Sequence, residues 1–357
     1  MGQGTVKKAR QTPSAAALRA IAKAALRQFG QLIPGVHIKF IAHNENATFK
    51  VTHRSASIDA GSGVRRRDET AGVSMLLRIH YPNQEFRSPI WQRYEVIQSE
   101  LVWLEALQSD TMLVTPRPLR TPDGSSIVQM EARFCDEPVN CTLLHWLPGR
   151  HLGRRTGRHA HGMGTMVGRL HQHSRKWHPP EGFIRPNYDW DRLAGPLEPL
   201  HEAVKQGKVT HDQYEELARA MQKTHELLQC LPRNRETWGL IHADLHENNY
   251  LFDNGSPRPI DFSCCGFGYY LYDVGYALRQ FAPTVRQPFI SGYTESIDLP
   301  EGWCELVEGF AIAGWIGNLA FRHATPARDE TFKQTVRQVM STCVSPYLAG
   351  QTWLFGP

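Results

Sequence analysis

A break at Pro148-Gly149 separates two stretches of this chain whose hydrophobic patterns require different folds. Short apolar runs of strand character dominate the first stretch, and apolar residues at helical spacing dominate the second. Strands are expected at residues 36–41, 48–52, 73–80, 127–134 and 139–146, and helices at residues 90–108, 162–175, 212–230 and 303–323, with short strands again at 240–261. This order predicts an α+β fold in which a small β-rich front lobe, residues 1–146, is hinged to a larger helical back lobe, residues 147–357.

The length and composition agree with such a two-lobed globular chain. The 357 residues suffice for about two domains, and 41% of them are hydrophobic, which is enough apolar mass for real cores. The sequence contains no uninterrupted run close to the roughly 18 apolar residues that a membrane span needs. We therefore expect no membrane partner, while the number of subunits is not encoded in any pattern that we recognise.

Charge is distributed unevenly along the chain. Residues 1–180 hold 25 Lys and Arg against 13 Asp and Glu, whereas residues 181–357 hold 15 against 22. A basic front half suits polyanions such as nucleotide phosphates, and an acidic back half suits cations or metal ions, although a solvated charged surface explains the same counts.

The cysteines and the N-terminus bear on localisation. Seven scattered cysteines without a C-x-x-C pair predict reduced thiols in a cytoplasmic protein. Residues 1–44 lack acidic side chains until Glu45, as transit peptides do, but residues 15–29 also read as an ordinary amphipathic helix. A targeting segment is thus an open alternative to the cytoplasmic assignment.

The strongest chemical signal lies in residues 241–252, which read IHADLHENNYLF. Transfer of phosphate from ATP needs a carboxylate that orients the acceptor hydroxyl and oxygen ligands that hold Mg²⁺ on the phosphates. Asp244, Asn249 and Asp261 supply this set, with Asp261 in an Ile-Asp-Phe sequence twelve residues after Asn249. This spacing is that of a kinase catalytic loop followed by a metal-binding loop.

These motifs resemble the aminoglycoside phosphotransferase-like family of small-molecule kinases. The similarity rests on HADLHENNYLF and PIDFSCCGFGYYLYDVGYAL, and it extends back through ENATFKV, LLRIH, IQSELVWLEAL, LLHWLPG and VGRLHQHSRKW over residues 35–325. The family has a two-lobed protein-kinase-like fold and uses ATP and Mg²⁺, and its C-terminal motifs are the specific part of the match.

The resemblance assigns roles to individual residues. It implies that Asp244 is the catalytic base and that Asn249 and Asp261 are the magnesium ligands. Arg78, on the third expected strand, stands where the family has a basic residue on the α- and β-phosphates, and Glu100 would pair with it. A carboxylate that fixes a cation in one rotamer makes electrostatic sense at such a position.

The backbone near His145 and Leu147 would form the hinge that contacts adenine. The chain also departs from the family pattern. Ala243 replaces the commoner glycine, and Ser263 and Cys264 stand where many members have further acids, which puts secondary metal contacts in doubt. Arg78 itself replaces the usual lysine and is a bulkier phosphate-binding group.

Other candidate sites are weaker. Residues 159–161 and 171–173 each hold a histidine pair, but side chains two apart on a helix point in different directions, which argues against a metal site. The resemblance implies that His171 is a packed helix histidine. Asp273 is expected to tie the catalytic loop in place. Residues 65–67 are three arginines without interleaved aromatics, so no nucleic-acid partner is expected.

The sequence therefore predicts an ATP- and Mg²⁺-dependent kinase that phosphorylates a hydroxyl of a small molecule such as an amino alcohol, a homoserine-like compound or an aminoglycoside. Two alternatives stay open: a Ser/Thr protein kinase of the bacterial stress-response type, and a non-catalytic nucleotide-binding module. The resemblance implies that the acceptor site is built largely by the helical lobe, including residues 303–323, with Trp315 and Asn318 expected to face inward. The acidic back half slightly favours a cationic acceptor.

Overall fold

The computed structural model describes residues 13–53, 73–83, 89–325 and 331–356. The three arginines at residues 65–67, for which no nucleic-acid partner is expected, lie outside these ranges, as does the start of the N-terminal segment. The chain forms two compact units. The β-rich unit comprises residues 1–106, 116–147 and 182–184, and the helical unit comprises the remainder.

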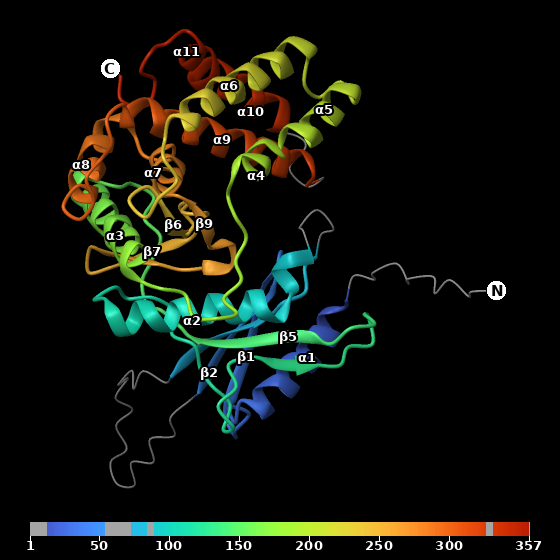
Figure 1. The fold of residues 1–357 in the computed structure, drawn as a ribbon. Helices are drawn as coiled ribbons and strands as arrows, with labels where there is room; N and C mark the ends of the chain where they lie inside the picture. The colour runs from blue at the N-terminus through green and yellow to red at the C-terminus, as the bar shows by residue number, and fades with distance from the viewer. Residues whose placement is uncertain (1–12, 54–72, 84–88, 326–330, 357) are drawn as a thin grey trace, which may run out of the picture. The chain divides into compact units, whose positions relative to one another are not determined.

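A five-stranded antiparallel sheet is the centre of the β-rich unit (Figure 1). Its order is β1-β2-β3-β5-β4, so the two C-terminal strands join the edge opposite the first hairpin. The strands are β1 (Val36–His43), β2 (Ala47–His53), β3 (Ser74–Ile79), β4 (Val128–Met130) and β5 (Val139–His145).

The two faces of this sheet carry different helices, because side chains alternate between faces along a strand. Met75, Leu77 and Ile79 of β3 are fully buried on the face covered by α1 (Ala15–Gln28), which begins at the N-cap Ser14. Arg78 points to the other face, where Figure 1 shows α2 (Tyr94–Asp110) across the sheet from α1. The register pairs Arg78 with Thr142 of β5.

The expected order of elements in this unit is confirmed, with corrections at two boundaries. The strand expected at residues 127–134 ends at Met130, because residues 131–137 turn back toward β5 instead of continuing the ladder. The helix expected at residues 90–108 is divided into a 3-10 turn, Pro89–Gln92, and α2.

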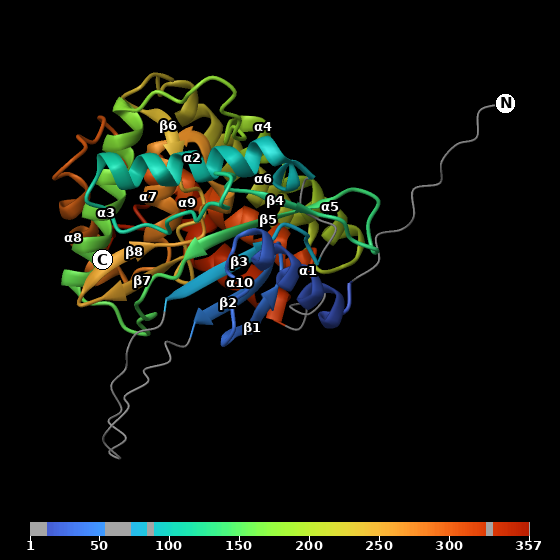
Figure 2. The same cartoon turned by 90° about the horizontal axis from the view of Figure 1, so that it is seen from below.

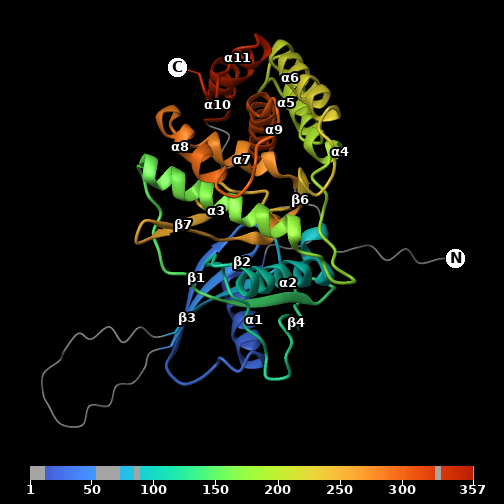
Figure 3. The same ribbon diagram turned by 60° about the vertical axis from the view of Figure 1, so that its left-hand side comes forward.

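The helical unit contains most of the helices of the described residues together with two short two-stranded sheets (Figures 2 and 3). Strand β6 (Trp238–Ile241) pairs with β9 (Gly266–Tyr269), and β7 (Tyr250–Asp253) pairs with β8 (Ser256–Pro259). The helices are α3 (Gly157–Lys176), α4 (Trp190–Ala194), α5 (Leu197–Lys205), α6 (His211–Gln229), α7 (Tyr270–Leu278), α8 (Pro283–Tyr293), α9 (Trp303–His323), α10 (Phe332–Val339) and α11 (Ser345–Leu348), with a π-helical turn at Met340–Val344.

Helix α9 is the central helix of this unit. By length and composition it passes for a membrane span, yet 67% of its most apolar window is buried inside the protein. Val307, Phe310 and Ile312 are completely buried in the same core as α6 and α7. Its apolar character is thus explained by burial on several faces within the fold.

Helices α3 and α8 pack with unusually close backbones, and Figure 3 shows them side by side. A Cβ on Gly164 would lie 1.9 Å from the carbonyl oxygen of Phe289, and one on Gly292 would lie 2.1 Å from that of His161. Only glycine allows this approach, because real Cβ atoms do not come within 3.0 Å of a backbone atom.

We therefore expect Gly164→Ala to destabilise the protein by roughly 1–3 kcal/mol, since α3 and α8 must separate. The measurement is the free energy of unfolding in urea. Gly157→Ala is the matched control in the same helix, because its Cβ would make an ordinary 3.5 Å contact with Pro288. Equal stability of the two variants would contradict the close packing.

Candidate active site

A loop of the helical unit, residues 242–249 between β6 and β7, presents the predicted base. The loop is anchored from α7 by Asp273, which is fully buried. Asp273 Oδ2 accepts a hydrogen bond from His242 N at 2.7 Å, and Oδ1 accepts one from Ala243 N at 2.7 Å. This confirms the structural role expected of Asp273.

His171 completes the anchor from α3. Its Nε2 lies 3.2 Å from Asp273 Oδ2 and its Nδ1 lies 3.0 Å from the hydroxyl of Tyr293, and the ring is fully buried. The expectation that His171 packs within the fold is confirmed. Within the described residues, no group of three His, Cys, Asp or Glu side chains is arranged to hold a metal ion.

Both turns of the site contain backbone that is unusual for residues with a side chain. Ala243 has φ +64° and Asp261 has φ +58°, in the left-handed region that glycine adopts more readily. Two 2.7 Å hydrogen bonds to Asp273, from the amides of His242 and Ala243, hold Ala243 in this conformation. Local strain of this kind is often found at functional loops.

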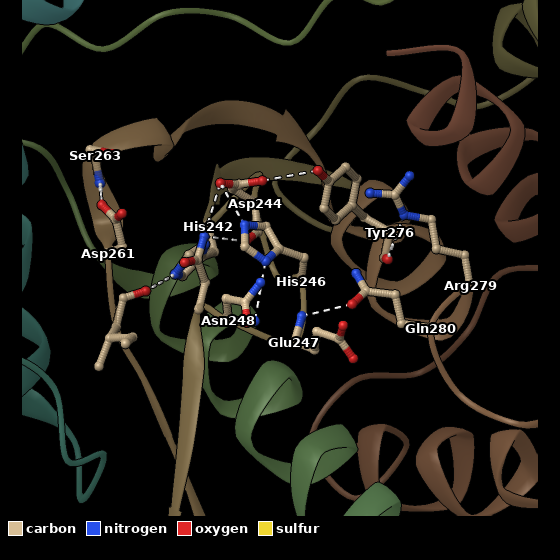
Figure 4. A network of polar contacts seen from close by, with 12 residues as sticks. His242, Asp244, His246, Glu247, Asn248, Asp261, Ser263, Tyr276, Arg279 and Gln280 are labelled. Carbon is tan, nitrogen blue, oxygen red and sulfur yellow. Dashed lines mark hydrogen bonds and ion pairs between the residues drawn. The ribbon is translucent and has the colours of Figure 1, made fainter. Parts of the chain in front are cut away.

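The Asp244 carboxylate is held at both oxygens (Figure 4). Oδ1 accepts a hydrogen bond from the Tyr276 hydroxyl at 2.9 Å, and Oδ2 accepts one from Asn249 Nδ2 at 2.9 Å. Asn249 Nδ2 also donates to the Asp244 carbonyl at 3.0 Å. The loop therefore brings two of the predicted residues, Asp244 and Asn249, into direct contact.

His246 lies beside the same carboxylate, with Nε2 3.5 Å from Asp244 Oδ2. Asn248 N donates to His246 Nδ1 at 3.2 Å, so the proton of the neutral ring is on Nε2, facing Asp244. Burial lowers the pKa of His246, but the hydrogen bond and charge of Asp244, together with the charge of Asp261, raise it more. Conversely, burial raises the pKa of Asp244, and His246, His242 and the Tyr276 hydrogen bond outweigh this effect and keep it below its ordinary value.

Asp261 follows β8 and precedes a short 3-10 turn, Phe262–Cys264. Its carboxylate accepts a hydrogen bond from Ser263 N at 3.4 Å, and in Figure 4 Asp244 lies between Asp261 and Tyr276. His242 connects the two loops, because its Nε2 lies 3.0 Å from the carbonyl of Ile260. The predicted base and both predicted metal ligands thus sit on two loops of one unit.

The residues of the Asp261 turn are fixed by groups that the sequence did not single out. Arg185, 6% exposed, donates through Nε to the Cys265 carbonyl at 2.6 Å and through Nη2 to the Ser263 carbonyl at 2.7 Å. Tyr188 donates to the Cys264 carbonyl at 2.7 Å. The turn at Ser263 to Cys265 is therefore held through its backbone carbonyls.

The donor set of Asn249 and Asp261 fits Mg²⁺. Because Asn249 Nδ2 is turned to Asp244, its amide oxygen is left to accept a cation, and Asp261 adds a carboxylate. Mg²⁺ is commonly bound by one or two protein oxygens together with substrate phosphates and water, so a third protein ligand is not required.

The other predicted residues lie in the β-rich unit. Arg78 and Glu100 form an ion pair with Nη2 and Oε1 2.8 Å apart, and they are only 3% and 2% exposed. Arg78 Nε also donates to Thr142 Oγ1 at 3.3 Å. The expected pairing of Arg78 with Glu100 is thus present, and the buried carboxylate fixes the guanidinium in one orientation.

His145 is the last residue of β5, and Leu147 lies two residues further along the chain. The backbone N–H of His145 donates to the Arg117 carbonyl at 2.8 Å, and that of Trp146 donates to the Ser74 carbonyl at 3.0 Å. Among the described residues, the N–H of Leu147 has no backbone acceptor. The His145 ring contacts Arg117 at 2.6 Å, and burial with this positive charge lowers its pKa.

A surface cavity of about 590 Å³ lies elsewhere in the helical unit, at the ends of α2 and α3. It is lined by Asp110, Thr111, Met112, Arg169, Gln172, His173, Lys176, Trp177 and His178. None of the predicted site residues belongs to it, and the converging hydrogen bonds around Asp244 identify the loop as the better candidate site.

A β-rich unit and a helical unit with this catalytic-type loop define the class: phosphotransferases of protein-kinase-like fold. Comparison with known proteins places the chain within it. Residues 52–306 match the model of the phosphotransferase enzyme family, and the chain belongs to that family. This confirms the family resemblance and the fold class predicted from the sequence.

The individual relatives share about a quarter or less of their aligned residues with this chain. Amicoumacin kinase of Bacillus subtilis (strain 168) is 24% identical over 163 residues, which cover 42% of this chain and 46% of that protein. The match therefore spans less than half the length of this curated relative. A microcompartment-associated aminopropanol kinase has a similar structure, with TM-score 0.74 and 23% identity over 94% of this chain and 99% of that one. Amicoumacin kinase hAmiN, solved with AMP-PNP, Ca²⁺ and its ligand, gives TM-score 0.67 and 16% identity over 91% and 93% of the two chains.

Proposed function

We propose that this protein transfers the γ-phosphate of ATP to a hydroxyl group of a small molecule. The observation that carries the proposal is the Asp244 carboxylate, which is ionised, held at both oxygens and adjacent to an asparagine whose amide oxygen is turned away from it. The family is one of phosphotransferases, and the relatives named above are kinases of aminopropanol and amicoumacin.

In the proposed reaction Asp244 accepts the proton of the acceptor hydroxyl. The acceptor oxygen forms a bond to the γ-phosphorus as the bond from that phosphorus to the β,γ-bridging oxygen breaks, and the electron pair leaves with ADP. Positioning of the hydroxyl and its deprotonation by a carboxylate are the contributions of the loop. Bound Mg²⁺, held by Asn249 and Asp261, would supply positive charge to the phosphates.

Residues of the β-rich unit would hold the nucleotide. Arg78, kept in one rotamer by Glu100, would neutralise charge on the α- and β-phosphates. The N–H of Leu147 and the backbone near His145 would contact adenine.

The charge of the back half of the chain indicates which class of acceptor compound to test first. The acidic composition of residues 181–357 favours a cationic acceptor, and the relatives described above are kinases of aminopropanol and of amicoumacin. A panel of amino alcohols, homoserine and aminoglycosides, each tested by ADP release, should contain at least one acceptor. If radiolabelled ATP marks proteins of a lysate while every small molecule fails, the protein-kinase alternative replaces this proposal.

The metal assignment has its own test. We expect ATP turnover to be abolished by EDTA, and Asp261→Asn to weaken Mg²⁺-dependent binding of AMP-PNP by at least about 10-fold in calorimetric titration. Asp253→Asn is the control, because this acid of β7 pairs with Arg258 outside the site. Equal Mg²⁺ dependence of the two variants would remove Asp261 from the ligand set.

A further inference from the structure

Helix α7 contributes a second functional side chain to the catalytic loop besides the anchor Asp273. Tyr276 lies three residues after Asp273, so both side chains emerge from one face of the helix. Asp273 holds the backbone amides of the loop, and Tyr276 reaches the carboxylate of Asp244 itself, as Figure 4 shows.

The two oxygens of Asp244 are restrained by different elements. Tyr276 OH donates to Oδ1 at 2.9 Å from α7, and Asn249 Nδ2 donates to Oδ2 at 2.9 Å from the far end of the loop. Bonds at both oxygens fix rotation about the terminal torsion of the side chain, which is otherwise broad for aspartate. An ionised carboxylate oxygen accepts more than one hydrogen bond, so Oδ1 keeps capacity for an acceptor hydroxyl.

Arg279 reinforces the tyrosine. Its guanidinium carbon lies 3.8 Å from the centroid of the Tyr276 ring, and it is fixed by hydrogen bonds from Nη1 to the Gly314 carbonyl at 2.6 Å and from Nε to the Tyr276 carbonyl at 3.2 Å. A cation over the ring face draws electron density from the phenol and makes its hydroxyl a better donor. The arginine thus favours the bond to Asp244 without contacting the carboxylate.

We propose that Tyr276 is a positioning residue for phosphoryl transfer, which sets the orientation of the Asp244 carboxylate toward the acceptor hydroxyl, and that Arg279 strengthens this bond through the ring. The inference rests on the proposed function. It assigns to Tyr276, a side chain outside the catalytic loop, a role that involves binding neither ATP nor metal.

The test compares Tyr276→Phe with Tyr272→Phe. Tyr272 is a buried tyrosine of the same helix, and its hydroxyl makes no hydrogen bond recorded in the described part of the chain. With an acceptor from the panel above, Tyr276→Phe is expected to lower kcat roughly 10- to 100-fold and to leave KM for ATP and for the acceptor within about threefold. Tyr272→Phe should keep kcat within about threefold of the wild type.

Crystal structures of both variants give a second readout that needs no acceptor. The Asp244 carboxylate should rotate or adopt two conformers in Tyr276→Phe and keep its single orientation in Tyr272→Phe. An unchanged carboxylate in Tyr276→Phe overturns the inference, even if the wild type phosphorylates no compound and the proposed function itself fails. A moved carboxylate with unchanged kcat on a true acceptor overturns the positioning role while the kinase function stands.

The contribution of Arg279 is measured by a double-mutant cycle. Arg279→Met should lower kcat when Tyr276 is present and add little in the Tyr276→Phe background, because the arginine acts through the tyrosine. Equal, additive effects in the two backgrounds overturn the coupling between Arg279 and Tyr276.

Discussion

Asp244→Asn should lower kcat by about 10²–10⁴-fold with the acceptor identified by the panel, because an amide cannot accept the hydroxyl proton. The fold should be retained. The amide oxygen can accept from Asn249 Nδ2, and the amide nitrogen can donate to the Tyr276 hydroxyl, which accepts as well as donates. Binding of AMP-PNP should therefore be close to that of the wild type, which separates lost chemistry from lost structure.

Glu247→Gln is the matched control for this prediction. Glu247 is an acid of the same loop, with its side chain 58% exposed and paired with Arg155 on the surface. The same change from acid to amide should alter kcat there by less than about threefold, because exposed ion pairs contribute little. If Asp244→Asn keeps more than a tenth of the wild-type rate, Asp244 is not the base.

The candidate site shows what local sequence encodes. The grouping of Asp244, Asn249 and Asp261 on two loops of one unit could be predicted because the three residues are close in sequence; their roles as base and metal ligands stay predictions. Arg78 and Glu100 could be predicted through family position, and their pairing is seen in the β-rich unit. Residues of this kind can be recognised from the sequence pattern of a single strand, helix or loop.

The supporting residues were missed because their roles depend on tertiary packing. Tyr276 reaches Asp244 from a helix 32 positions further along the chain, and Arg185 holds the Asp261 turn from a segment 78 positions before Ser263. No local pattern marks either contact. His246 was within the quoted motif, but only the bond from Asn248 N to its Nδ1 reveals that its proton faces Asp244.

Two errors in the elements have physical causes. Helix α7 was not predicted, because Tyr270, Leu271, Val274 and most of its other residues are buried, so the apolar periodicity that marks a surface helix is lost. Helix α3 begins five residues before its predicted start. The capping pair Thr156 and His159 initiates it, although the glycines that follow lower helix propensity.

The Asp273 anchor should be the costliest polar group of the helical unit to alter. The present carboxylate accepts hydrogen bonds from two backbone amides, those of His242 and Ala243, and it also faces His171 Nε2. In Asp273→Asn only one side-chain oxygen remains to accept hydrogen bonds. The amide nitrogen would point a donor at another donor in a fully buried place. We expect a loss of about 3–5 kcal/mol in the free energy of unfolding, because a fully buried polar network loses an acceptor and gains a misplaced donor.

Tyr293→Phe tests the same network at its other end, because Tyr293 OH meets His171 Nδ1 at 3.0 Å and does not touch the loop. Its loss should be about 1 kcal/mol. Since His171 connects Tyr293 to Asp273, the two changes should not add, and the double variant should be less destabilised than their sum. Urea unfolding of the three variants decides the matter: if Asp273→Asn costs no more than Tyr293→Phe, the loop is held in its left-handed turn at Ala243 by something other than this carboxylate.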